Sequence, residues 1–195
     1  MCGLYIYIGS QSIDLEKVTD VIKHRGPNAF GAMTYCHQSG EIKKGQKCGL
    51  AEGPKVAFGF RRLSIIDLSE KANQPFSSPD GRYHIIFNGE IYNYIELRND
   101  LIKLGHEFKT ESDTEVLLNA YKEWGVSFFN NLNGMWAVCI LDISKKQVII
   151  SRDRFGIKPL FYYQSNDGIH FFSEIKQIRA IVPDLKITES QIRDY

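Results

Sequence analysis

The sequence lacks several features that assign a protein to a class directly. None of its apolar runs approaches the length of a membrane-spanning helix. No cluster of basic residues precedes the first apolar stretch, since the first lysine is Lys17, and this argues against a secretory signal peptide. The formal net charge is only +1, so no strong field favours nucleic acid or an anionic membrane. We therefore expect a cytoplasmic protein with no nucleic-acid or membrane partner.

Cysteines are few and scattered. The four of them, Cys2, Cys36, Cys48 and Cys139, form no C-x-x-C pair and have no histidine cluster beside them. This pattern argues against a zinc site, and we expect no metal or other cofactor in this domain. Cys36, Cys48 and Cys139 lie in apolar or loop sequence, so we expect them to be packing residues.

The sequence also has no internal repeat, no low-complexity tract and no linker before the last dozen residues, which indicates one domain. Apolar patterning predicts strands at residues 2–9, 29–36, 56–66, 83–88, 136–142, 147–152, 160–164 and 169–173. Helical spacing predicts helices at residues 15–22, 95–104, 114–124 and 174–181. Residues 37–55 are expected to form a polar hairpin, and Asn88-Gly89 to form a turn that ends its strand. Strands, then helices, then strands again are typical of an α+β fold with antiparallel sheets.

Among the features that are present, Cys2 is the most informative. If Met1 is removed, this residue carries a thiol and a free α-amine, so that a nucleophile and a base share one residue. A free α-amine has a pKa of about 8, which suits a group that must take and give protons. If Met1 stays attached, the nitrogen of Cys2 is an amide and Met1 would crowd the pocket. The plainer alternative is a small residue that opens a buried strand.

A thiol that attacks an amide needs donors for the oxyanion that develops on the carbonyl oxygen. Asn88 and Gly89 offer a side-chain amide and a backbone N–H directly after an apolar strand. The alternative for this dipeptide is an ordinary hairpin turn.

A free amino-acid substrate would also need both of its charged ends held. Arg61 and Arg62 are candidates for an α-carboxylate, because a guanidinium pairs with a carboxylate through two hydrogen bonds. Glu90 and Asp113 are candidates for an α-ammonium. Each of these residues also has a structural alternative, such as a charged strand end or a helix cap.

Seven segments follow one another along the chain in a recognisable order. They are Met1-Cys2-Gly3, His24-Arg25-Gly26-Pro27, 62–67, 87–93, 112–115, 132–135 and 152–160. This ordered set resembles the glutaminase domain of glutamine-hydrolysing asparagine synthetases, and the resemblance covers essentially the whole chain.

The resemblance implies a fold and a set of roles. The fold would be an N-terminal-nucleophile hydrolase, an α+β four-layer αββα sandwich of two antiparallel sheets. Cys2 would be the nucleophile, with its own α-amine as the base, and Asn88 and Gly89 would form the oxyanion hole. The implied substrate-binding residues are Arg62, Leu63, Ser64, Ile65, Ile66, Asn88, Gly89, Glu90 and Asp113, and Arg61 would be a bystander.

The implied activity is hydrolysis of glutamine to glutamate and ammonia through a thioester on Cys2. The ammonia would pass to a C-terminal synthetase domain of the same protein that amidates aspartate and holds ATP and magnesium. Residues 1–187 would form the glutaminase domain, and residues 188–195 would start the synthetase domain.

Several alternatives stay open. The same glutaminase can serve an acceptor other than aspartate, or a domain of this fold can be non-catalytic. An amidase that acts on a peptide or an antibiotic would explain Cys2 but not the groups suited to a free amino acid. A homodimer is neither predicted nor excluded.

Overall fold

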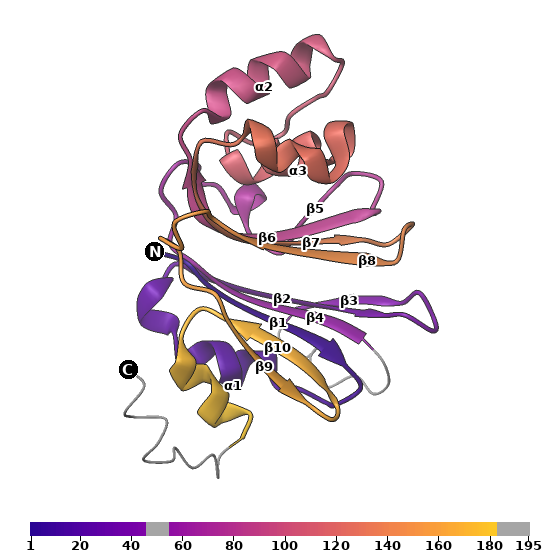
Figure 1. Cartoon of the computed structure of the whole chain (residues 1–195), viewed down its shortest axis with the longest axis vertical. Helices are drawn as coiled ribbons and strands as arrows, with labels where there is room; N and C mark the ends of the chain where they lie inside the picture. Colours follow the sequence, from indigo (N-terminus) through magenta and orange to yellow (C-terminus); the bar gives the residue numbers. More distant parts are fainter. Residues whose placement is uncertain (46–54, 183–195) are drawn as a thin grey trace.

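A computed structural model describes residues 1–45 and 55–182, which form two antiparallel sheets packed face to face (Figure 1). The six-stranded sheet contains, in spatial order, β3 (Ile42–Lys44), β2 (Ala29–Cys36), β4 (Lys55–Arg62), β1 (Gly3–Gly9), β10 (Gly168–Phe172) and β9 (Phe161–Ser165). The four-stranded sheet contains β5 (Phe76–Ser77), β6 (Tyr83–Ile91), β7 (Gly134–Asp142) and β8 (Gln147–Arg152).

Helices cover the outer face of each sheet (Figure 1). Helices α2 (Tyr94–Lys103) and α3 (Asp113–Trp124) cover the four-stranded sheet, and α1 (Leu15–Asp20) covers the other together with the 3₁₀ helix η5 (Ile175–Ala180). The 3₁₀ helices η1 (Lys23–Arg25), η3 (Glu70–Ala72) and η4 (Gly125–Asn131) lie in connections. The predicted four-layer αββα sandwich is therefore confirmed. Within the described ranges, none of the helices has the length and apolar character needed to cross a bilayer.

Each interface between layers has its own hydrophobic core. Strand β1 contributes to two of them, because Leu4 and Ile6 pack between the sheets while Tyr5 and Tyr7 pack on the side of α1. A strand that is covered on both faces has a continuous apolar sequence, as observed here. Cys139 is fully buried between the sheets, which confirms its predicted packing role.

The prediction of a turn at Asn88-Gly89 is wrong. Strand β6 continues through both residues to Ile91, with Asn88 opposite Ala137 and Gly89 opposite Trp136 on β7. The glycine is needed for space rather than for a turn, because a Cβ atom there would overlap the Met135 carbonyl oxygen and the Phe87 ring. The dipeptide therefore lies inside a strand, where it pairs with β7.

Two further predictions need correction. Strand β4 ends at Arg62 instead of Ile66, since the chain leaves the sheet there to form a loop around the Arg62 side chain. The predicted helix at 174–181 is the 3₁₀ helix η5, which begins with a reciprocal capping box between Glu174 and Gln177. The predicted hairpin at 37–55 is present as far as Gly45, where β2 pairs with β3. Residues 46–54, with Cys48, and the predicted boundary at 187 lie outside the described residues.

Candidate active site

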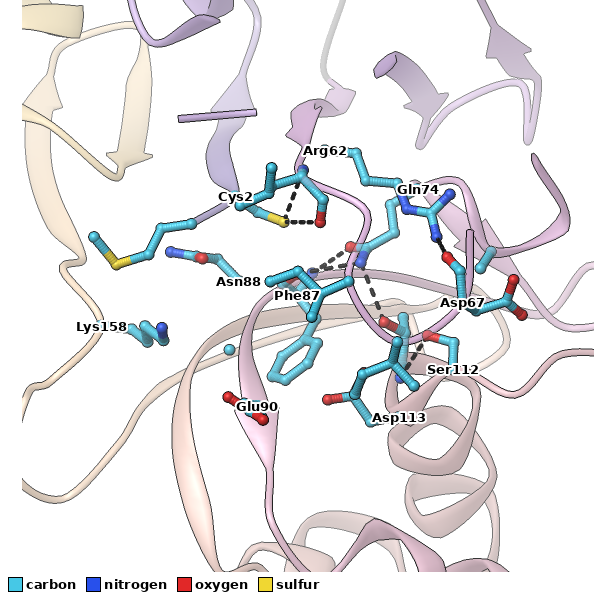
Figure 2. Close-up of a pocket in the computed structure, with 17 residues that line it drawn as sticks. Cys2, Arg62, Asp67, Gln74, Phe87, Asn88, Glu90, Ser112, Asp113 and Lys158 are labelled. Atoms are coloured by element: carbon cyan, nitrogen blue, oxygen red, sulfur yellow. Dashed lines mark hydrogen bonds between the residues drawn. The ribbon is translucent and has the colours of Figure 1, made fainter. Parts of the chain in front are cut away.

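A cavity of about 110 Å³ lies where the start of β1, the end of β4, the middle of β6 and the start of α3 meet (Figure 2). Nine of the predicted site residues line it: Cys2, Arg62, Leu63, Ile65, Ile66, Asn88, Gly89, Glu90 and Asp113. Ser64 is not among the lining residues, and its backbone nitrogen instead donates to Asn28 Oδ1 at 3.1 Å. The folded chain thus brings together side chains that are up to 111 positions apart in the sequence.

The thiol of Cys2 is anchored on the loop that follows β4. Its Sγ atom accepts a hydrogen bond from the Leu63 backbone nitrogen at 3.3 Å and lies 3.6 Å from the Leu63 carbonyl oxygen. Burial raises the pKa of the thiol, while the bond from Leu63 opposes that shift. Met1 also lines the cavity, and its attachment makes the nitrogen of Cys2 an amide. In this form the thiol is therefore protonated and has no free amine of its own.

Arg25 fixes the backbone of Cys2, a contact that the sequence reasoning missed. Its Nε atom donates to the Cys2 carbonyl oxygen at 2.9 Å. The next residue, Gly26, must be a glycine, because a Cβ atom there would overlap the backbone of Arg61. The available signal was the segment His24-Arg25-Gly26-Pro27, which belongs to the ordered set of motifs but had no predicted role of its own. This segment brings a guanidinium to the backbone of Cys2 and lets the chain pass close to β4.

Asn88 presents a buried donor without an acceptor. The residue is 1% exposed, and its Nδ2 atom has no hydrogen-bond partner within the described part of the chain. Buried amide groups are normally paired, because an unpaired one costs about 1–3 kcal/mol. Asn88 is one of the residues that line the cavity containing Cys2, which makes this nitrogen the candidate donor to a substrate oxygen there.

Arg62 holds the wall of the cavity. Its guanidinium donates to the Ser69 carbonyl oxygen and to Asn73 Oδ1, both at 2.8 Å, and also to the Asp67 carbonyl oxygen. The Asp67 carboxylate in turn accepts from the Glu111 backbone nitrogen at 3.0 Å, which ties this loop to the segment before α3. A guanidinium has five N–H donors, so three contacts leave about two for a ligand. The contacts that Arg62 makes with the loop therefore leave donors for its predicted role in substrate binding.

Asp113 is the first residue of α3 and not its cap. The cap is Ser112, whose Oγ accepts from the Thr114 nitrogen at 3.1 Å. The Asp113 carboxylate accepts from the Ile91 nitrogen at 3.3 Å, and burial raises its pKa to about 6. In Figure 2, Glu90 and Asp113 lie on the side of the cavity away from Cys2. The cavity therefore has a thiol on one side and two acidic groups on the other.

Gln74 and Lys158 are among the lining residues that were not predicted as site residues. Gln74 accepts from the Phe87 nitrogen at 2.6 Å and donates to Thr114 Oγ1 at 3.1 Å, which joins its loop to β6 and α3. Lys158 is 6% exposed and belongs to a loop that Asp153 organises by accepting from the Lys158 nitrogen at 2.9 Å. Lys158 lies in the sequence segment 152–160, whereas nothing in the sequence pointed to Gln74.

The arrangement suits covalent chemistry on an amide. One cavity is lined by a thiol, by Asn88, whose amide nitrogen has no partner among the described residues, and by two acidic residues. A thiol can attack an amide carbon, and an amide N–H can stabilise the oxyanion that forms. Within residues 1–45 and 55–182, no group of three or more His, Cys, Asp or Glu side chains is arranged to hold a metal ion.

Comparison with solved structures bears out the fold. A glutamine phosphoribosylpyrophosphate amidotransferase from B. subtilis superposes with a TM-score of 0.75 at 21% identity, covering 93% of this chain and 44% of that one. At this identity the likeness concerns the fold alone, and it confirms the N-terminal-nucleophile hydrolase architecture.

Sequence comparison identifies the family. "Asparagine synthetase [glutamine-hydrolyzing] 1" of Bacillus subtilis is 41% identical over 93% of this chain, and "Amidase chry2" of Gibberella zeae is 36% identical over 86% of it. The chain spans about a quarter of the length of these relatives, 26% and 22% respectively. The sequence model of the glutamine amidotransferase domain matches residues 1–195. The chain therefore belongs to the glutamine amidotransferase domain family.

Proposed function

We propose that the chain hydrolyses glutamine to glutamate and ammonia through a thioester on Cys2. The observation that carries the proposal is the shared cavity. Cys2, Asn88 and the buried Asp113 all line it, and the amide nitrogen of Asn88 has no hydrogen-bond partner among the described residues. Membership of the glutamine amidotransferase domain family supports glutamine as the substrate.

The first half of the reaction forms the thioester. Once Met1 is removed, the α-amine of Cys2 takes the thiol proton, and the thiolate attacks the side-chain amide carbon of glutamine. The Nδ2 group of Asn88 and the backbone N–H of Gly89 donate to the oxyanion. The α-ammonium then gives its proton to the amide nitrogen, the C–N bond breaks, and ammonia leaves.

The second half of the reaction restores the thiol. The α-amine takes a proton from a water molecule, which attacks the thioester carbon and forms a second oxyanion at the same donors. The C–S bond breaks, and the sulfur recovers its proton from the α-ammonium as glutamate leaves. Both halves therefore use the same base and the same pair of donors.

Recognition of the free amino acid falls to the charged residues of the cavity. We assign the α-carboxylate of glutamine to the two remaining donors of Arg62, and its α-ammonium to Glu90 and Asp113. Leu63, Ile65 and Ile66 would contact the aliphatic part of the substrate, since they line the same wall. We expect Ser64 to act through its backbone, because its nitrogen already bonds to Asn28.

The names of the relatives support a destination for the ammonia. We propose that a C-terminal synthetase domain, which binds ATP and magnesium, uses the ammonia to amidate aspartate to asparagine in the cytoplasm. The name of the Bacillus subtilis relative supports this acceptor. The similarity to a Gibberella zeae protein called an amidase favours, as the second candidate, the same glutaminase serving a different acceptor.

The proposal is tested by measuring the glutamate and ammonia that protein without Met1 releases from glutamine. The Cys2→Ala variant should release neither, while Cys36→Ala is the matched control because this half-exposed cysteine is not among the residues that line the cavity. Unchanged ammonia release by Cys2→Ala would remove Cys2 from the mechanism.

A further inference from the structure

Just after β10 ends, the Glu174 carboxylate contacts three basic side chains. Its Oε1 atom lies 3.0 Å from Arg25 Nη1 and 3.0 Å from His24 Nε2, and its Oε2 atom lies 2.9 Å from Lys176 Nζ. Burial opposes ionisation of this carboxyl, but hydrogen bonds from Lys176, Arg25 and His24 lower its pKa to about 2. Glu174 therefore carries a negative charge at any working pH.

Arg25 connects this charge to the nucleophile. Its side chain is 8% exposed, and it donates through Nη1 to Glu174 and through Nε to the Cys2 carbonyl oxygen at 2.9 Å. A guanidinium is planar and rigid, so two partners fix both its position and its orientation. The Arg25 guanidinium thus bridges the Glu174 carboxylate and the backbone of Cys2.

The backbone around Glu174 is itself held in register with β1. The Leu4 nitrogen donates to Ser173 Oγ at 3.0 Å, and the Ser173 nitrogen donates to the Leu4 carbonyl oxygen at 3.1 Å. Gln177 Oε1 accepts from the Glu174 nitrogen at 3.1 Å and completes the capping box of η5. The main chain is therefore held in place both at Glu174 and next to Cys2, the two residues that Arg25 connects.

We propose that Glu174 is a positioning residue for the glutaminase reaction, which holds Arg25 on the Cys2 carbonyl and so fixes the main chain that presents the sulfur. The proposal rests on the proposed function. Once Met1 is removed, Cys2 is the chain terminus, and termini are poorly ordered unless side chains tie them down. A displacement of the reacting atom by about 1 Å can cost about a hundredfold in rate.

Glu174 has no place in the substrate-binding cavity, and this separates its effect from substrate recognition. It is not among the residues that line the cavity. Its loss should therefore lower kcat and leave the KM for glutamine nearly unchanged, because the ground-state contacts of glutamine do not involve it.

A double-mutant cycle in protein without Met1 tests the inference. We expect Glu174→Gln to lower kcat about tenfold with KM within about twofold, since the amide keeps an oxygen for the η5 cap but loses the charge that holds Arg25. In the Arg25→Met background the same substitution should change kcat by less than twofold, because the link is already absent. The matched control is Lys176→Met, which removes another partner of Glu174 and should keep kcat within twofold.

A second variant, together with the melting temperatures of all variants, distinguishes the loss of this contact from unfolding. Arg25→Lys keeps the charge, but its single nitrogen cannot hold both partners in the geometry of the guanidinium, so it should reproduce the loss of kcat. The positioning role would be overturned if Glu174→Gln lowered kcat equally in the wild-type and Arg25→Met backgrounds. It would also be overturned if Glu174→Gln in the wild-type background kept kcat within twofold of the wild-type value. A wild-type enzyme that produces no glutamate would instead overturn the proposed function, and the positioning role with it.

Discussion

The Leu63 backbone nitrogen lies 3.3 Å from Cys2 Sγ and donates a hydrogen bond to it. This contact joins the first residues of the chain to the loop that begins where β4 ends. Arg62 stands directly before Leu63 and holds the same loop through the Ser69 and Asp67 carbonyl oxygens. The surroundings of the sulfur therefore depend on a residue that is also proposed to bind the substrate.

Replacement of Arg62 should affect both binding and stability. We expect Arg62→Ala to raise the KM for glutamine at least tenfold, because a charge-assisted contact is lost in the ground state and in the transition state alike. Its melting temperature should also fall, because the loop contacts are lost. The control is Arg61→Ala, whose guanidinium contacts Asp20 and the Phe30 ring instead of the cavity. A large fall in kcat with an unchanged KM would contradict the role of Arg62.

Replacement of Asn88 should affect turnover alone. We expect Asn88→Ala to lower kcat by about 10²–10³ with little change in KM, as is typical when one oxyanion donor is removed. The melting temperature should hardly fall, because the Nδ2 atom of Asn88 makes no hydrogen bond in the described structure. Steady-state kinetics and thermal unfolding measure the two effects separately. Asn99→Ala, at an exposed position on α2, serves as the control. A variant that keeps wild-type kcat would remove Asn88 from the oxyanion hole.

Glutamine binding should weaken as the solution becomes acidic. The pKa of Asp113 is raised to about 6 by burial, and only its ionised form attracts an α-ammonium. Calorimetry on the inactive Cys2→Ala protein should therefore give a Kd that rises up to tenfold for each pH unit below about 6. Asp113→Asn should bind weakly and lose this dependence. An unchanged pH profile in Asp113→Asn would assign the titration to another group.

Two buried histidines should make the fold sensitive to acid. Burial lowers the pKa of both His84 and His170 to about 4, whereas an unfolded histidine titrates near about 6.5. Between these values the unfolded state binds more protons than the folded state, so the free energy of unfolding should decrease as the pH falls from about 6.5 to 4. Denaturant titrations across this range should reveal the slope. His84→Gln should flatten it, and an equal slope in that variant would exclude His84 as a source.

The sequence singled out most of the candidate residues that line the cavity, but not the residues that hold them in place. Cys2, Asn88 and Asp113 lie in recognisable motifs, and their side chains face one cavity as expected. Gln74 could not be predicted, because its partners Phe87 and Thr114 are 13 and 40 positions away and only the folded chain brings them together.

The layers were predictable and some boundaries were not. Apolar patterning identified eight of the ten strands in the described residues. It missed the two-residue strand β5, and β3 was expected only as part of the hairpin at 37–55. The Asn88-Gly89 pair resembles a turn by local propensity, but pairing of β6 with β7 overrides that propensity. The end of β4 was missed for a similar reason, because the loop contacts of Arg62 decide it.

Removal of Met1, followed on the same samples by intact mass and glutaminase assay, tests the account most directly. Preparations that differ only in the fraction of chains beginning at Cys2 should show specific activity in proportion to that fraction, because only those chains have a basic nitrogen beside the sulfur. Full activity in protein that retains Met1 would contradict the claim that one residue supplies both nucleophile and base.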